Sequence, residues 1–196
     1  MNLVELTAVA AAALPIAEFR DHLRLGSGFA DDGGQDGILE AYLRAAIASI
    51  EGRTGKVLLS RDFSWDLTRW FACDRQGLPV APVSALLSLT QVAFDGTETA
   101  LDLSDVQLRE DLFRPQIVAR ALPSIPTDGV IRITFTAGFG ASWSAVPADL
   151  AQAVFLLAAG NYEARAGEFG SGATLPFGVL SLIERYKTVR LTGDSL

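Results

Sequence analysis

The spacing of apolar residues changes twice along this chain, from the period of a helix to that of a strand and back again. Before Gly55, apolar side chains recur every three or four residues, as they do on one face of a helix. From Val130 to Ala137, apolar and polar residues alternate, which is the pattern of a half-buried strand. The helical period returns after Pro147. This order predicts an α+β fold, in which N-terminal and C-terminal helix pairs (four helices) flank a central antiparallel β insertion.

Turn and capping residues indicate where these segments end. Gly55 is a natural C-terminal stop for a helix over 36–54, and Asp95 with Gly96 is a strong hairpin signal. We predict a single domain of 196 residues, whose parts are an N-terminal segment (1–13), two helices (14–55), a β region (56–140), two further helices (146–187) and a C-terminal tail (188–196). Within the β region, strands are expected at 63–67, 86–94, 106–108, 117–119 and 130–137.

Two of the predicted helices, 36–54 and 147–165, carry more apolar residues than one narrow face can hold. A single core does not easily cover both sides of such a helix, so a second partner is implied, such as another subunit. The residues that we predict at a subunit interface are Leu39, Tyr42, Leu43, Ile47, Leu150, Val154, Phe155, Leu157 and Tyr162.

The acidic net charge argues against strong binding to DNA, and the short apolar runs argue against a segment that spans a membrane. The chain has 16 Lys and Arg against 23 Asp and Glu, a formal net charge of −7. Binding to a phosphate backbone draws its free energy from Lys and Arg that displace counterions, so any contact with DNA should be glancing. The longest apolar run near the middle of the chain, 153–160, is far shorter than the roughly 20 residues that a bilayer requires. We therefore expect no membrane partner.

The sequence offers few residues for catalysis or metal binding. His22 is the single histidine and Cys73 the single cysteine, so a triad or metal site would have to be built on them. The glycines at 55 and at 138–140 lack the spacing of a P-loop or a dinucleotide-binding motif. We expect no catalytic residue, cofactor or metal. The alternative is a small α+β hydrolase or ligand-binding domain with a polar pocket around His22 or Cys73.

Short segments of distinctive composition follow one another from Pro15 to Lys187. They are Phe19 to Leu25, Asp31 with Asp32, Ile50 and Glu51 with Thr54 and Gly55, Leu78 and Pro79 with Pro82 and Val83, Thr136 to Gly140, Val146 to Leu150, Tyr162 and Glu163 with Arg165, and Leu175 to Gly178. As an ordered set they resemble the head-to-tail connector (adaptor) family of tailed phages and gene transfer agents. One departure is Ala159 with Gly160, where relatives often carry bulkier residues, and close helix packing is the expected reason.

The resemblance implies a structural protein rather than an enzyme. It implies a ring beneath the portal, expected to follow the portal's twelve-fold symmetry, whose lumen lets DNA pass from capsid to tail without specific binding. The implied partners are further copies of the chain, the portal protein and a stopper or tail-side neck protein. The implied location is the neck of a phage or gene-transfer-agent particle that assembles in the bacterial cytoplasm. A ring closed by heterologous contacts needs two different apolar patches on each copy, which two-sided helices supply.

Two points stay open at the level of sequence. The tail after Lys187 carries no helical or globular pattern, and we predict that it orders on the portal, with a frayed terminus as the alternative. Another neck protein, such as a stopper or tail terminator, is the alternative function and predicts a β-dominated core. The portal-contact candidates in the tail are Thr188, Val189, Arg190, Leu191, Thr192 and Leu196.

Overall fold

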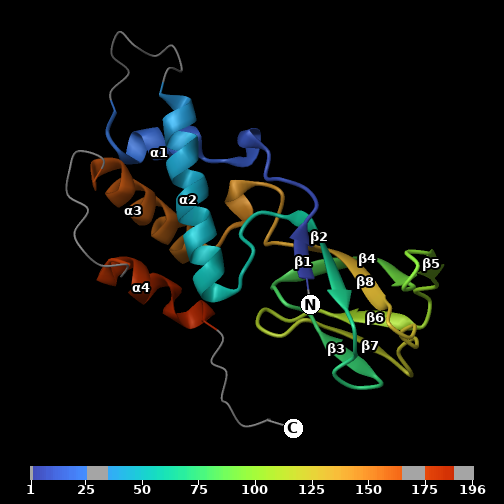
Figure 1. The fold of residues 1–196 in the computed structure, drawn as a ribbon. Helices are drawn as coiled ribbons and strands as arrows, with labels where there is room; N and C mark the ends of the chain where they lie inside the picture. Colours follow the sequence, from blue (N-terminus) through green and yellow to red (C-terminus); the bar gives the residue numbers. More distant parts are fainter. Residues whose placement is uncertain (1, 26–34, 165–174, 188–196) are drawn as a thin grey trace. The chain divides into compact units, whose positions relative to one another are not determined.

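The chain forms two compact units, shown in Figure 1. The structure is a computed structural model that describes residues 2–25, 35–164 and 175–187. The β unit comprises Met1–Val9 and Val57–Ala141, and the helical unit comprises Ala10–Lys56 and Ser142–Leu196. The longer segment of the β unit lies within one residue of the predicted β region, 56–140. The predicted α+β class, with four α-helices and antiparallel sheets, is confirmed within the described ranges.

The described strands of the β unit form two antiparallel sheets. The larger sheet has the order β1 (Asn2–Glu5), β2 (Arg61–Leu67), β8 (Val130–Ala137), β4 (Val83–Val92) and β5 (Glu98–Leu101). The smaller sheet has the order β3 (Arg75–Gly77), β7 (Gln116–Ala119) and β6 (Val106–Arg109). Every neighbouring pair is antiparallel, and β8 lies at the centre of the larger sheet between β2 and β4.

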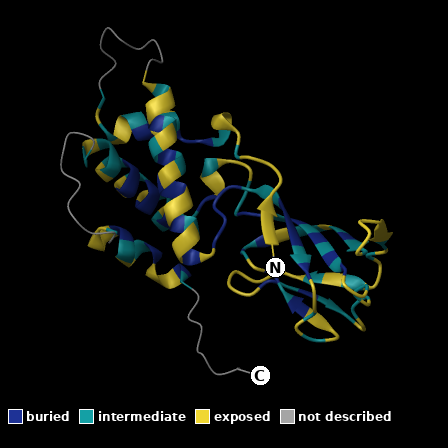
Figure 2. Ribbon diagram, in the orientation of Figure 1, coloured by how far each residue is buried: buried dark blue, intermediate teal, exposed yellow. Residues whose placement is uncertain are grey.

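One apolar cluster fills the interior of the β unit. Along β8, buried residues alternate with half-buried ones, as the striped colouring of the strands in Figure 2 shows. Residues paired across strands point to the same face, so β2 and β4 add their apolar side chains to the same side. The smaller sheet contributes to the same cluster, and the two sheets therefore share one core. Its largest buried members include Phe63, Trp65, Leu67, Leu89, Ile117, Ile131, Ile133 and Phe135.

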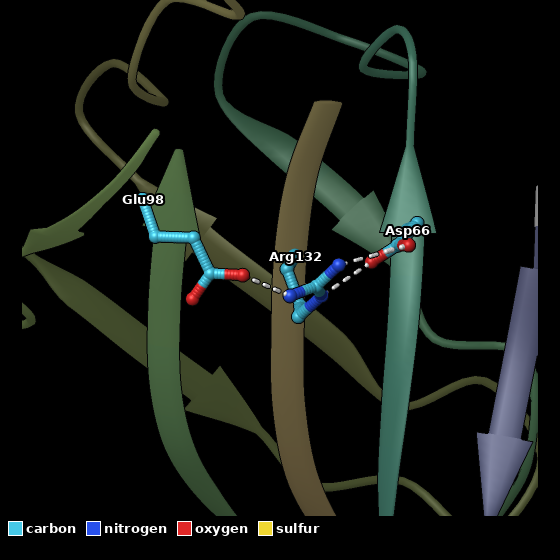
Figure 3. Close-up of polar contacts among 3 residues, drawn as sticks. All are labelled: Asp66, Glu98 and Arg132. Carbon is cyan, nitrogen blue, oxygen red and sulfur yellow. Dashed lines mark hydrogen bonds and ion pairs between the residues drawn. The ribbon is translucent and has the colours of Figure 1, made fainter. Parts of the chain in front are cut away.

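The opposite face of the larger sheet carries an ion network centred on Arg132 of β8 (Figure 3). Arg132 Nε donates a hydrogen bond to Asp66 Oδ1 on β2 at 2.9 Å, and Arg132 Nη1 donates to Glu98 Oε1 on β5 at 2.5 Å. The hydrogen bond to Asp66 is the largest influence that raises the pKa of the Arg132 guanidinium above its ordinary value. Arg132 thus connects β2 with β5, although these strands are not neighbours in the sheet.

Gly138 follows β8 in a conformation that side chains rarely adopt. Its φ is +135°, and a Cβ at this position would lie 2.5 Å from the backbone N and Cα of Ser60. The chain is held this close by backbone hydrogen bonds, because Gly138 N–H donates to the Pro82 carbonyl at 2.9 Å and Ser60 N–H to the Gly140 carbonyl at 2.8 Å. The positive φ and the close approach to Ser60 therefore explain why glycine occupies position 138 within the segment Thr136 to Gly140.

The described residues of the helical unit form four α-helices, α1 (Ile16–His22), α2 (Asp36–Thr54), α3 (Ala148–Ala164) and α4 (Phe177–Ile183). Three short 3₁₀ helices accompany them, η1 (Ala11–Ala13), η2 (Trp143–Ala145) and η3 (Glu184–Tyr186). α2 packs against α3, α3 against α4, and α1 against α2. Gly55 ends α2 with a φ of +67°, as its position in the sequence predicts.

The structure also corrects the predicted strands. β4 ends at Val92 rather than at Phe94, because the chain turns there and Ala93 N–H donates to the Thr97 carbonyl at 2.9 Å. β1, β3 and β5 were not predicted, and β1 comes from the N-terminal segment, 1–13, to which no element was assigned. The predicted third helix is α3, and its predicted last residue, Arg165, lies outside the described residues.

Gly138→Ala should lower the free energy of unfolding of the β unit by about 3 kcal/mol, because a clash with Ser60 adds to the strain of a side chain at positive φ. Urea unfolding followed by tryptophan fluorescence measures this loss. Gly77→Ala is the matched control, since no atom lies within 4 Å of the place that its Cβ would take. Equal stability of the two variants would contradict the assignment.

Candidate subunit interface

Each long helix of the helical unit buries one face. The buried residues are spaced three and four apart, which places each set on a single side of its helix. Because the two faces pack against each other, this core stabilises one copy without a partner. The buried residues are Leu39, Leu43, Ala46, Ile47, Ile50 and Thr54 on α2 and Leu150, Ala153, Val154, Leu157 and Ala158 on α3.

Most of the predicted interface residues lie in this core. A second copy can cover only surface that is still exposed, so residues buried within one copy support the subunit fold instead. The remaining predicted residues, Tyr42, Phe155 and Tyr162, are half-buried and keep surface for a partner. The buried candidates are Leu39, Leu43, Ile47, Leu150, Val154 and Leu157, of which the most exposed retains 7% of its surface.

Phe155 of α3 lies at the centre of an aromatic cluster. The ring centroids of Phe19, His22 and Trp143 lie 5.8, 5.5 and 5.7 Å from the centroid of Phe155. Ring pairs at these separations contribute roughly 0.5–1.5 kcal/mol beyond the burial of apolar area. The cluster gives His22, the last residue of α1, a packing role, and it holds the Phe155 ring in place.

Tyr42 of α2 and Tyr162 of α3 meet edge to face, with ring centroids 5.8 Å apart. Ile38 precedes Tyr42 by one helical turn and is 45% exposed. Residues four apart lie on the same side of a helix, so Ile38, Tyr42 and Tyr162 form one apolar surface, the tyrosine surface. Tyrosine suits a protein contact because its ring is apolar while its hydroxyl tolerates water.

The described residues offer little to the alternative of a hydrolase or ligand-binding domain. They contain no group of three His, Cys, Asp or Glu that could hold a metal ion. Cys73 is exposed in the β unit, whereas His22 belongs to the helical unit. A hollow of about 610 Å³ on the β unit is lined by Ser104, Gln107 and Arg120 among others, and its lining includes neither His22 nor Cys73.

Across the described ranges, no helix combines the length and apolar character needed to span a bilayer.

A buried tyrosine, Tyr186, connects η3 to the start of α3 through a hydrogen bond. The Tyr186 hydroxyl donates to Asp149 Oδ1 at 2.7 Å, and the side chain is 1% exposed. Burial, followed by the hydrogen bond to Asp149, raises the pKa of Tyr186 above its ordinary value. Asp149 also forms an ion pair with Arg185 and lies in the first turn of α3, where a carboxylate complements the helix dipole.

The predicted portal contact concerns the C-terminal tail. Its candidates lie outside the described residues, so their role stays a prediction. They are Thr188, Val189, Arg190, Leu191, Thr192 and Leu196.

Comparison with known proteins shows which family has this fold. No protein-family model and no curated protein matches the chain. Among solved structures, a chain from the neck of an empty gene transfer agent particle, computed with C6 symmetry, has a TM-score of 0.90 and 56% identity, with 99% of each chain covered. The chain belongs to the gene transfer agent neck proteins.

Two further structures resemble this neck protein over the same extent. A chain from the virion of a native gene transfer agent particle has a TM-score of 0.87 and 56% identity, and 99% of each chain is covered. A chain from the neck of a native particle, computed with C12 symmetry, has a TM-score of 0.85 and 52% identity with the same coverage. The family resemblance found in the sequence is thereby confirmed at the level of neck proteins, and it includes both the β unit and the helical unit.

Tyr186→Phe should lower the free energy of unfolding of this neck protein by about 1–2 kcal/mol at neutral pH, because the hydrogen bond from the buried Tyr186 hydroxyl to Asp149 is lost. The raised pKa adds a pH dependence. Above the ordinary tyrosine pKa of 10.0, Tyr186 ionises in the unfolded chain before it ionises in the folded chain, so the wild type loses stability as the pH rises.

Urea unfolding at neutral pH and just above the ordinary pKa of tyrosine measures both effects. The Phe variant should show a smaller loss of stability with rising pH than the wild type. The double variant with Asp149→Ala should cost less than the sum of the two single changes, because both remove the same hydrogen bond. An unchanged pH dependence in the Phe variant would contradict this role of Tyr186.

Proposed function

We propose that this neck protein is the head-to-tail connector (adaptor) of a gene transfer agent or phage-like particle. In this role it forms a ring beneath the portal, joins the capsid to the tail and lets DNA pass. The observation that carries the proposal is the likeness to gene transfer agent neck chains over 99% of both chains. Those necks were computed with C6 and C12 symmetry, which supports a homo-oligomeric ring, and we propose twelve copies. The role is structural and involves no turnover of a substrate.

The proposed ring contact uses apolar surface that the helical unit leaves exposed. The tyrosine surface (Ile38, Tyr42 and Tyr162) is one such area, and Leu156 on α3 is another, with 37% of its surface exposed. In a heterologous contact, one patch of a copy packs against a different patch of the next copy. The buried faces of α2 and α3 support this contact from inside, because they hold the half-buried aromatic rings in position.

The organisation of the chain favours the connector over a stopper or tail terminator, for which a β-dominated core was expected. The helical unit has its own apolar core, built on helices of 19 and 17 residues. The net charge of −7 supports passage of DNA without binding, because an acidic wall repels the phosphate backbone. The proposed partners are the portal on one side and a stopper or other tail-side neck protein on the other.

Ile38→Asp should disrupt ring assembly and leave the fold of each copy intact, because the side chain is already exposed. We expect the protein concentration at which half of the copies are assembled to rise by about tenfold, which corresponds to about 1.4 kcal/mol. Leu87→Asp on β4 is the matched control, since Leu87 is also 45% exposed. Sedimentation and negative-stain microscopy of protein co-produced with the portal measure assembly. Equal assembly of both variants would contradict a contact through the tyrosine surface.

Cryo-electron microscopy of particles that carry this chain tests the connector role itself. We expect a ring of twelve copies in direct contact with the portal, with density for residues 188–196 on the portal side. A ring that contacts only tail-side proteins would assign the chain to the stopper or terminator class instead.

A further inference from the structure

Within the described residues, the larger sheet of the β unit is open at both edges. Among the described strands, β1 pairs only with β2, and β5 pairs only with β4. Each outer edge therefore presents backbone N–H and C=O groups that another strand can bind. Native edge strands are commonly protected by Lys, Pro or a bulge, but β1 and β5 contain no Lys or Pro, and the register irregularities of this sheet lie between β4 and β8.

A row of apolar side chains crosses this sheet from one edge to the other. The strand register places Leu3 opposite Trp65, Trp65 opposite Ile133, Ile133 opposite Leu89, and Leu89 opposite Leu101. Residues paired in this way point to the same face. The three inner residues are buried, whereas Leu3 is 37% exposed and Leu101 is half-buried. The row is therefore covered along its middle and uncovered at its two ends.

The directions of the two edge strands, β1 and β5, allow them to pair with each other. Four antiparallel steps separate β1 from β5, so the two strands run the same way. Copies in a cyclic ring are related by rotation about one axis, which preserves the direction of a strand along that axis. The β5 edge of one copy can therefore meet the β1 edge of the next in parallel, and two different edges make the heterologous contact that a closed ring requires.

The acidic residues on the two edges are neutralised within each copy. On β1, Glu5 Oε2 lies 3.0 Å from Arg61 Nε, and on β5, Glu98 Oε1 accepts a hydrogen bond from Arg132 Nη1. The two carboxylates also lie on opposite faces of the sheet, because Glu5 shares the face of Leu3 whereas Glu98 lies on the face of Arg132, so they do not face each other across the strand pair. Charge thus does not prevent the two edges from joining.

We propose that β5 of each copy pairs in parallel with β1 of the next copy, so that the larger sheets of the ring join into one closed band. Leu3 is then covered by Leu101 of the neighbouring copy, and the apolar row continues around the ring. This inference rests on the proposed ring, and it gives the N-terminal segment a role in assembly.

Disulfide cross-linking in assembled particles tests the pairing. Cys73→Ser removes the exposed native thiol, and Leu3→Cys with Leu101→Cys then places two thiols at the ends of the row. Mild oxidation should give a ladder of linked copies on a non-reducing gel. A second pair, Glu5→Cys with Leu101→Cys, detects the same strand pairing if β1 and β5 align in a register displaced by two residues.

The matched control is Val4→Cys with Leu101→Cys, which uses the same two strands. Val4 points to the opposite face from Leu3, so its Cβ is directed away from Leu101. We expect at least about tenfold less cross-linked product from this pair, because a disulfide forms only when the two Cβ atoms lie close together.

A charged edge provides a second test. Leu3→Lys should raise the concentration for half-assembly by about tenfold, which is about 1.4 kcal/mol. Leu112→Lys, in the loop between β6 and β7, should leave assembly unchanged, and both leucines are 37% exposed in the wild type.

The outcomes separate this inference from the proposed function. Intact rings that give no ladder from either test pair would overturn the strand pairing and leave the connector role standing. Wild-type particles without a ring of this chain would overturn both.

Discussion

The alternation along β8 is the constraint on which the β unit depends. Its apolar side chains build the shared core, and its polar side chains include Arg132, which connects β2 with β5. Because the side-chain period of a strand is two residues, a slip of one residue would turn the whole apolar set toward the polar face. β2 follows this register without a break along Arg61–Leu67, and β4 follows it from Ser88 to Val92. That register also aligns Leu3 with Leu101, so it decides what the free edges can bind.

Long elements could be predicted from the sequence because many residues repeat one pattern. The predicted bounds 36–54 and 130–137 are those of α2 and β8. Strands of three or four residues contain few alternations, so the sequence predicted β6 and β7 but not the equally short β1, β3 and β5. β5 pairs with β4 across the turn that Asp95 and Gly96 signal, but β1 and β3 form through pairing with partners far along the chain, as when β1 pairs with residues some sixty positions later. Such pairing leaves no local signal.

Residues of the subunit core could not be distinguished by sequence from candidates for a subunit contact, because both use the same residue types. Leu43 and Val154 have the spacing and composition of a contact stripe, yet packing between α2 and α3 leaves them no exposed surface. Tyr42 and Tyr162 differ in that they are only half-buried. The family, in contrast, could be inferred from the sequence, because its short segments are spread along most of the chain and do not depend on which side chains are buried.

The origin of β1 limits how the β unit could be exchanged between relatives. Residues 57–141 look like a cassette inserted between two groups of helices, but one edge of the larger sheet is supplied by residues 2–5. If the cassette were transplanted alone, β2 would lose its outer partner, and Arg61 would lose its ion pair with Glu5. A functional chimera must therefore carry both stretches from the same parent, and recombination within this family should keep them linked.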